Sequence, residues 1–568
     1  MRSRRGDWRA ALVVSGALVS ALLPLARGGA QSPTPTQLLS RGFDFEDAGK
    51  LDSAAVLFRR AIAAGERQQG LLGLERVLTM AGRRSELVAV ADSVIAAQPA
   101  DGTAYAVKLR ALTGSAERPA FRATLAAWAA RRPSDAEPWR DAARALLEAG
   151  QAAAADSVLG DAVSALGSTR GVASEAAQVH VRLGRFEQAA RSFREAMRES
   201  PWLVESAVYA LRSTPPERRA ATMNGLLAPP IGDAARRAAA SLRMGWGDPA
   251  AAWAALKGLP PSDSTAEEWE AFGARARTMQ APLIAREALV SALEIRRRAS
   301  VALDAAEASL DAGEAPVALD LVELARLSAD TAGTALRRAV VRTRALAMAG
   351  RLADAAREVS ALRDPLARRR AAAALAEGHA LAGDLASAAR VADAEGLTVE
   401  DDPAATWVAF WRGDFATARR GLSAFTDGRR PAARAMSLLT RTRTATAPVT
   451  GGAFLLLARG DSAGAQAAFE RAATEVPDAA SFLLLEAARL ADARRDQPAA
   501  ARLWEALVQR DRNSPEAAEA RLARARAAIR RGELTQARSD LEALILDQPS
   551  SALVPQARRE LERMGARP

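Results

Sequence analysis

The chain has 568 residues and a formal net charge of +11, and it contains no cysteine. This length exceeds what one compact hydrophobic core supports, so we expect several domains or one elongated array. The lack of cysteine excludes disulfides, thiolate catalysis and cysteine metal sites, and it also excludes a lipoprotein anchor, which is attached to a cysteine.

The excess of positive charge does not by itself predict nucleic-acid binding. Lysine occurs only at Lys50, Lys108 and Lys257, so nearly all of the positive charge is arginine, interleaved with aspartate and glutamate. Such interleaving is typical of solvated helix faces. Aromatic residues make up only 4% of the chain, which favours alanine-rich, closely packed helices over sheets. We favour a structural role for most arginines and keep a basic binding surface as the alternative.

Residues 1–30 are predicted to be a cleavable signal peptide. Arginines within residues 2–9 precede an apolar run from Ala10 to Ala26, and small residues follow at 28–30. The run is shorter than the roughly 20 residues that span a bilayer, and Pro24 interrupts it, which favours cleavage over a retained anchor. We expect export, with the periplasm of a Gram-negative bacterium as the leading compartment and an extracellular location as the alternative.

From about residue 36 onwards, the chain repeats one helix–turn–helix pattern. Its clearest copy is Leu183–Pro201, reading LGRFEQAARSFREAMRESP. Gly184 ends one helix, and Ala189, Phe193 and Ala196 then share one stripe of the next helix. One hairpin cannot bury such a stripe alone, so the pattern requires stacked copies.

Copies of the hairpin are recognised by the same offsets of small and large apolar residues after the turn. Good copies follow Gly49, Gly460 and Gly532. Weaker copies turn at Gly82, Gly150, Gly247, Gly313, Gly350, Gly383 and Gly413, and turns without glycine lie near Ala116, Ser213, Gln280 and Arg495. Neighbouring turns are mostly about 33 to 34 residues apart, which gives about fifteen units.

This spacing and pattern resemble the tetratricopeptide repeat. The resemblance implies an all-α fold of helix–turn–helix repeats stacked into a right-handed α-solenoid superhelix. The family favours an aromatic residue early in the first helix of each hairpin, matched here by Tyr105, Trp139, Trp202 and Trp269. It favours a tyrosine-like residue late in that helix, matched by Tyr209, His180 and His379. We therefore predict that both histidines and several tryptophans are packing residues.

The step from Gly413 to Gly460 is longer than the others, and its surplus lies in residues 426–452. The pattern predicts an extra helix over Pro431–Thr442 and a linker over Ala445–Gly452. The segment is either a joint between two arrays or a surface insertion in one array. The predicted organisation is a signal peptide at 1–30, an N-terminal solenoid at 31–425, the insertion at 426–452 and a C-terminal array at 453–568. A polar capping helix is expected at Pro555–Arg563.

No motif in the sequence predicts catalysis. Two histidines and no cysteine leave few ways to build a metal or nucleophilic site, and neither H-E-x-x-H nor a P-loop occurs. Residues 460–464 match G-x-S-x-G, but that motif requires a strand-to-helix elbow, and here it lies at a hairpin turn. We expect no catalytic residue, no metal and no cofactor.

The first helix of each hairpin is expected to line the inner face of the superhelix. Counting back from each turn selects the candidate partner-binding residues Arg140, Arg144, Gln178, Arg182, Arg237, Arg337, Arg344, Arg370 and Arg526, with Glu267, Glu270 and Glu307 on the same face. Such a face favours an acidic or extended peptide partner through steering and arginine–carboxylate pairing. The competing interpretation is an unselective solvated surface.

The leading functional hypothesis is an exported, non-enzymatic scaffold for protein–protein interactions in the cell envelope. Its partners would be other proteins or extended peptide segments, with no small-molecule substrate and with membrane contact only through partners. One alternative is an accessory subunit of polysaccharide export, polysaccharide synthesis or outer-membrane assembly machinery. An enzyme with an unrecognised site and a nucleic-acid-binding protein are the remaining, less favoured classes.

Overall fold

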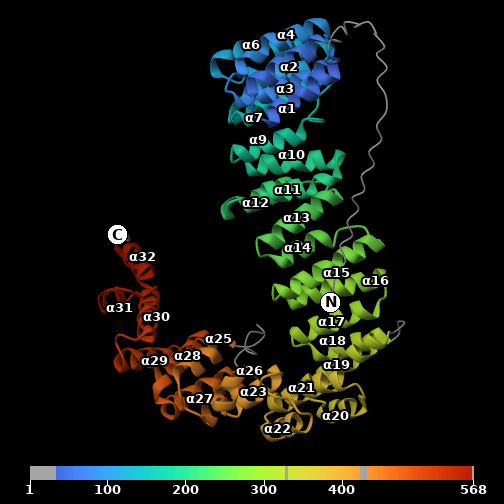
Figure 1. The fold of residues 1–568 in the computed structure, drawn as a ribbon. Helices are drawn as coiled ribbons and strands as arrows, with labels where there is room; N and C mark the ends of the chain where they lie inside the picture. The colour runs from blue at the N-terminus through green and yellow to red at the C-terminus, as the bar shows by residue number, and fades with distance from the viewer. Residues whose placement is uncertain (1–32, 327–330, 422–431, 566–568) are drawn as a thin grey trace, which may run out of the picture. The chain divides into compact units, whose positions relative to one another are not determined.

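The computed structural model describes residues 33–326, 331–421 and 432–565 (Figure 1). Within these ranges the chain forms 32 α-helices and no strand, apart from one isolated bridge between Asp414 and Thr446. The predicted all-α fold is therefore confirmed. The predicted signal peptide at 1–30 lies outside the described residues. None of the described helices is long and apolar enough to cross a membrane.

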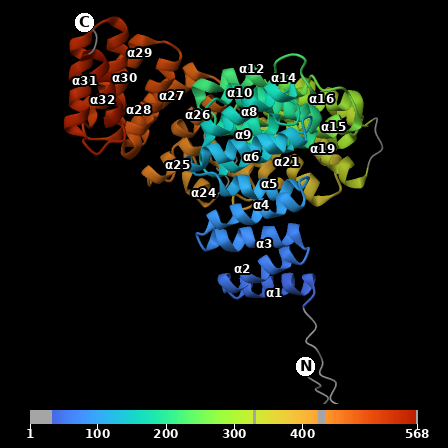
Figure 2. The ribbon, with the colours of Figure 1, turned by 90° about the horizontal axis from the view of Figure 1, so that it is seen from above.

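The chain forms two compact units that divide between Ala235 and Arg236. Each unit is a row of helix–turn–helix repeats, and Figures 1 and 2 show the helices following one another in chain order. The first unit contains α1 (Pro35–Asp47), α2 (Leu51–Ala63), α3 (Arg67–Met80), α4 (Leu87–Ala97), α5 (Gly102–Ala111), α6 (Arg118–Arg131), α7 (Glu137–Glu148), α8 (Ala152–Leu166), α9 (Ala173–Arg182), α10 (Phe186–Glu199), α11 (Val204–Leu211) and α12 (Arg219–Leu226).

The second unit takes over within α13 (Asp233–Gly245). It continues with α14 (Pro249–Leu256), α15 (Asp263–Thr278), α16 (Pro282–Ile295), α17 (Ala299–Asp311), α18 (Ala315–Arg326), α19 (Ala332–Met348), α20 (Leu352–Ala361), α21 (Pro365–Ala382), α22 (Leu385–Ala394), α23 (Pro403–Trp411), α24 (Phe415–Arg420), α25 (Ala432–Arg441), α26 (Pro448–Ala458), α27 (Ser462–Glu475), α28 (Ala480–Ala493), α29 (Gln497–Arg510), α30 (Pro515–Arg531), α31 (Leu534–Asp547) and α32 (Val554–Gly565).

The apolar stripe of the hairpin at Leu183–Pro201 is buried as predicted. Ala189, Phe193 and Ala196 are 0%, 1% and 5% exposed. Phe58 of α2 occupies the position equivalent to Phe193, and its surroundings show why a ring at this position needs small neighbours. A Cβ added at Gly42 of α1 or Gly73 of α3 would lie 2.7 or 2.6 Å from the Phe58 ring. The Phe58 ring therefore packs into space left by glycines on the two neighbouring helices.

The hairpin turns use the left-handed backbone conformation. Gly184 has a φ of 69°, and Gly460 has a φ of 80°. Any residue with a Cβ pays about 1–2 kcal/mol in this conformation. Gln280 and Arg495 nevertheless adopt φ values of 57° and 62°, at two of the turns predicted without glycine. The left-handed turn is thus kept at these two positions although glycine is missing.

The prediction that aromatic residues at fixed distances before each turn are packed holds for some hairpins and fails for one. Tyr105 and Trp269 are buried, whereas Trp202 and Tyr209 are 76% and 69% exposed. Tyr209 lies in α11, which has only eight residues, and Trp202 lies in the single 3-10 turn Pro201–Leu203 before it; an irregular turn without left-handed glycine follows α11. Counting back a fixed distance from that turn therefore no longer reaches the packed face, and the packing prediction for Trp202 and Tyr209 is wrong.

The surplus segment lies inside the second unit. Helix α25 falls within the range predicted for the extra helix, and its Leu438 and Leu439 belong to one hydrophobic core that runs from Ala376 to Ala520. The division between the two compact units therefore does not coincide with residues 426–452. The capping helix at the C-terminal end is also present as α32.

The linker predicted for Ala445–Gly452 is wrong in its second half, because α26 begins at Pro448. Its free N-terminal amides are satisfied by Glu475, which lies at the end of α27. The Glu475 carboxylate accepts hydrogen bonds from the amides of Val449 and Thr450 at 3.1 and 2.7 Å. A cap supplied by a residue this far downstream leaves no local signal in the sequence.

His180 of α9 is a packing residue, as predicted. The His180 side chain is 18% exposed, and its Nε2 atom lies 3.4 Å from an Asp156 oxygen while Nδ1 lies 3.2 Å from the Ser192 hydroxyl. Burial lowers the pKa of His180 below its ordinary value, and the negative charge of Asp156 offsets only part of this effect.

This depressed pKa predicts a loss of stability in acid. The unfolded chain binds a proton to His180 more readily than the folded chain does. The stabilisation from neutral His180 is therefore complete above a pH of about 6.5, and it is lost as the pH falls through the pKa of His180 in the folded chain. We expect the drop in unfolding free energy between about pH 8 and about pH 5.5 to be smaller in His180→Gln, as measured by urea denaturation. An equal drop in both proteins would contradict this assignment.

Candidate functional site

Arginine–carboxylate pairs join the first helices of neighbouring hairpins, and we call this set the arginine ladder. In the first unit, Arg144 of α7 pairs with Glu175 of α9 at 2.5 Å. In the second unit, the Arg489 guanidinium of α28 lies 2.7 Å from Glu519 of α30. Further members are Arg76–Glu46, Arg110–Glu75, Arg237–Glu268 and Arg526–Glu560. Partners lie about one repeat length apart in the sequence, because equivalent positions of adjacent first helices face one another.

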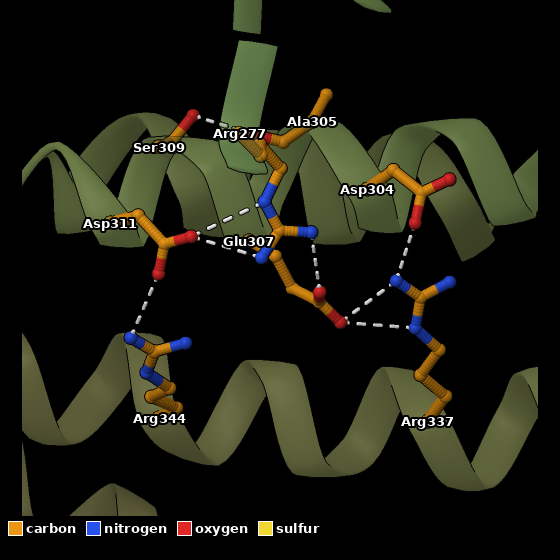
Figure 3. Close-up of polar contacts among 8 residues, drawn as sticks. All are labelled: Arg277, Asp304, Ala305, Glu307, Ser309, Asp311, Arg337 and Arg344. Carbon is orange, nitrogen blue, oxygen red and sulfur yellow. Dashed lines mark hydrogen bonds and ion pairs between the residues drawn. The ribbon is translucent and has the colours of Figure 1, made fainter. Parts of the chain in front are cut away.

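The ladder is most extensive across α15, α17 and α19, where it becomes a network (Figure 3). Arg277 of α15 donates to Glu307 at 3.0 Å and to Asp311 at 2.9 Å. From the other side, Arg337 of α19 donates to Glu307 at 2.8 Å and to Asp304 at 2.6 Å. Figure 3 shows Glu307 between the guanidinium groups of Arg277 and Arg337, with Asp304 contacting Arg337 alone.

The third cation of the network is Arg344 of α19, which donates to Asp311 at 3.2 Å. Burial acts to lower the pKa of Arg277, but its hydrogen bond to Asp311 and the charges of Asp311 and Glu307 outweigh burial and raise it. The pKa of Arg337 is also raised, because Asp304 and Glu307 outweigh the effect of its burial. The network is therefore held in its charged form.

A groove with a volume of about 930 Å³ opens beside this network. Its walls are the first helices α15, α17, α19, α21, α23 and α26, together with Pro282 and Leu289 of α16. In Figure 1 these first helices lie on the inner side of the bent row, with α20 and α22 outside. Charged lining comes from Arg277, Asp311 and Glu377, and apolar lining comes from residues such as Met348 and Trp411. The groove therefore offers charges of both signs beside an apolar floor.

The structure distributes the predicted site residues along both units. Arg337 and Arg344 meet in the network, and Arg344 also lines the groove. Arg144, Arg237 and Arg526 belong to other pairs of the ladder. Gln178, Arg182 and Arg370 are exposed, and Arg140 is half-buried. Whether any of these residues binds a partner stays a prediction.

Sequence reasoning missed Arg277, Asp304 and Asp311, which complete the network. It selected arginines by their offset from the turn without asking which acidic residue lies one repeat away. That pairing is visible in the sequence once the repeat length is known. It also missed that most of the arginines it selected are already paired with carboxylates of the chain itself. Glu267 and Glu270, expected on the same face, pair with Arg296 and Arg298.

Within the described ranges, no three histidine or acidic side chains are grouped so that they would hold a metal ion. The G-x-S-x-G match is a hairpin turn, as predicted. Its Asp461 side chain accepts a hydrogen bond from the amide of Gly464 at 2.8 Å and so caps the N-terminus of α27.

No protein-family model matches the sequence, and no curated protein matches it. Among solved structures, the chain is similar to the APC/C hetero-tetramer Cut9–Hcn1, with 11% identity, a TM-score of 0.23 and coverage of 93% of this chain and 96% of that chain. Yeast Tom70 gives 14% identity, a TM-score of 0.23 and coverage of 93% and 99%. Naa15/Naa10 bound to HypK-THB gives 13% identity, a TM-score of 0.21 and coverage of 94% of this chain and 91% of that chain. The fold assignment rests on the chain's own helices rather than on these similarities.

The network predicts a specific cost for removing its central carboxylate. Glu307→Gln leaves Arg277 and Arg337 without their shared negative charge, so we expect the unfolding free energy to fall by about 1–2 kcal/mol. Urea denaturation of the full chain measures this loss, and high salt should reduce it. The matched control is Glu323→Gln of α18, whose ion pairs with Arg326 and Arg342 lie at the surface because its side chain is 47% exposed, and for which we expect less than about 0.5 kcal/mol. Equal effects of the two substitutions would contradict a stabilising role of the network.

Proposed function

We propose that this protein is a non-enzymatic helical-repeat scaffold that binds other proteins through extended segments lying in the groove of the second unit. The observation that carries the proposal is the groove itself, which is built from first helices of successive hairpins. Such a row presents the same kind of surface at each step, and this suits an extended chain better than a small molecule.

The chemistry of the groove favours a partner with mixed character. Arg277 and Arg344 are paired with Asp311, so a purely acidic segment would compete with carboxylates of the chain itself. A segment that places apolar side chains against Met348 and Leu457, with polar or charged groups beside them, matches the lining better. An acidic partner remains the alternative, supported by the arginines of the ladder.

We further propose that the protein acts in the cell envelope after export. Support comes from residues 1–30, with their arginines, their apolar run and the small residues before Gln31. Within the envelope, an accessory role in polysaccharide export or synthesis, or in outer-membrane assembly, is the second candidate. An enzymatic role is less favoured, because the groove gathers ion-paired residues rather than a nucleophile with a base.

Site-specific photo-crosslinking in the native cell tests the scaffold. A photo-reactive amino acid in place of Met348 lies in the groove, and the matched control replaces Leu546, which is 77% exposed on α31. We expect protein adducts from position 348 and none of the same adducts from position 546. Identical adducts at both positions, or none at position 348, would contradict binding in the groove.

Export is tested separately by the N-terminus of the protein recovered from its own cells. We expect mass spectrometry to find a chain that begins at Gln31, because small residues precede that position. Ala30→Arg should block this cleavage and leave the longer chain. Recovery of an intact Met1 form of the unaltered protein would overturn the signal-peptide assignment.

A further inference from the structure

Helix α25 is an extra element in the repeat row. It stands between the hairpin α23–α24 and the hairpin α26–α27, yet α23 packs directly against α26. The chain closes beneath it through backbone hydrogen bonds from Ala447 to Gly413 at 2.8 Å and from Ala416 to Ala445 at 3.1 Å. The row of hairpins is therefore complete without α25, and what α25 covers requires its own explanation.

Helix α25 lies on the first-helix side of the hairpins that follow it. Arg434 and Arg441 lie seven residues apart, two helical turns, and so share one side of the helix. Arg434 pairs with Glu486 of α28 at 3.1 Å, and Arg441 pairs with Glu516 of α30 at 3.3 Å. One short helix thus bridges two consecutive first helices through charge pairs.

The two acceptor carboxylates are buried. The side chains of Glu486 and Glu516 are 1% and 8% exposed. Glu486 also pairs with Arg489 of its own helix through its other oxygen, at 2.6 Å, so the two Glu486 oxygens face different arginines. A buried carboxylate needs a cation, and removing one partner leaves an uncompensated charge. These carboxylates therefore form a preorganised receptor for a helix that brings arginines.

Apolar contacts complete the same surface. Ala435, Leu438 and Leu439 of α25 are 0%, 0% and 3% exposed. Phe482 of α28 lies under the Arg441 guanidinium, with 5.2 Å between that group and the ring centroid. The pattern of α25 is thus a pair of arginines two turns apart with an apolar stripe between them, seated as an amphipathic helix is seated in a groove.

We propose that the first-helix face of α28 and α30 is a binding surface for a basic amphipathic helix, and that α25 occupies it as an internal ligand. A partner helix of the same chemistry, with two arginines seven positions apart around an apolar stripe, displaces α25 and takes its ion pairs. This surface is distinct from the groove at α15–α26, so the proposal stands whether or not that groove binds a partner.

The test uses the full chain and a fluorescent synthetic peptide with the sequence of residues 432–444, AARAMSLLTRTRT. In the unaltered chain α25 competes with the peptide. The variant R434E/R441E places acidic groups against Glu486 and Glu516, which undocks α25. We expect fluorescence anisotropy to show at least about tenfold tighter peptide binding to this variant than to the unaltered chain. Adding E486Q and E516Q to the variant should remove the gain.

The matched control is R558E/R559E, which makes the same change of charge at exposed positions of α32 and should leave peptide binding unaltered. Hydrogen exchange of residues 432–441 reports whether α25 has left. Rapid exchange in R434E/R441E without tighter peptide binding would overturn the proposal, and so would unchanged protection of α25. Should that variant fail to fold, excess peptide is added to the unaltered chain instead, and hydrogen exchange of residues 432–441 is measured. Faster exchange of residues 432–441 supports displacement, and no change overturns it.

Discussion

The fold depends on one packing constraint, which is that no hairpin can bury its own apolar stripe. Phe58 is enclosed only because Gly42 and Gly73 of the flanking helices leave room for its ring, and Phe193 lies on an equivalent stripe between alanines. Each hairpin is thus stabilised by its neighbours, and stability is shared along the row rather than concentrated in one centre. The left-handed turns and the terminal helix α32 serve this arrangement by keeping every hairpin in step and covering the last stripe.

The same periodicity explains the charges. Equivalent residues of successive first helices face one another, so a cation on one helix meets whatever lies one repeat away on the next. In this chain that position often carries a carboxylate, as with Arg144 and Glu175 or Arg489 and Glu519. Several of the described arginines therefore hold adjacent hairpins together through carboxylates. The groove that results is lined by side chains of both charges.

Local signals predicted most of the fold, because the small residues, the turn glycines and their spacing all occur within the sequence of a single hairpin. Most of the failures have non-local causes. The start of α26 depends on Glu475 at the far end of the next helix, and the network depends on Arg277 meeting Asp311 two helices later. Trp202 and Tyr209 were misplaced because the irregular turn after α11 breaks the offset used to place them. Likewise, the receptor carboxylates Glu486 and Glu516 look like ordinary surface acids until α25 is seen against them.

The way the chain closes beneath α25 has a consequence for how such a protein changes over evolutionary time. Two backbone hydrogen bonds between 413–416 and 445–447 restore the register after the extra helix, so the following hairpins are undisturbed. Material inserted at a boundary between hairpins therefore costs the array little, whereas material inserted within a hairpin would shift every offset after it. New segments, including new recognition elements, can be gained and lost at these boundaries while the repeats on either side remain unaltered.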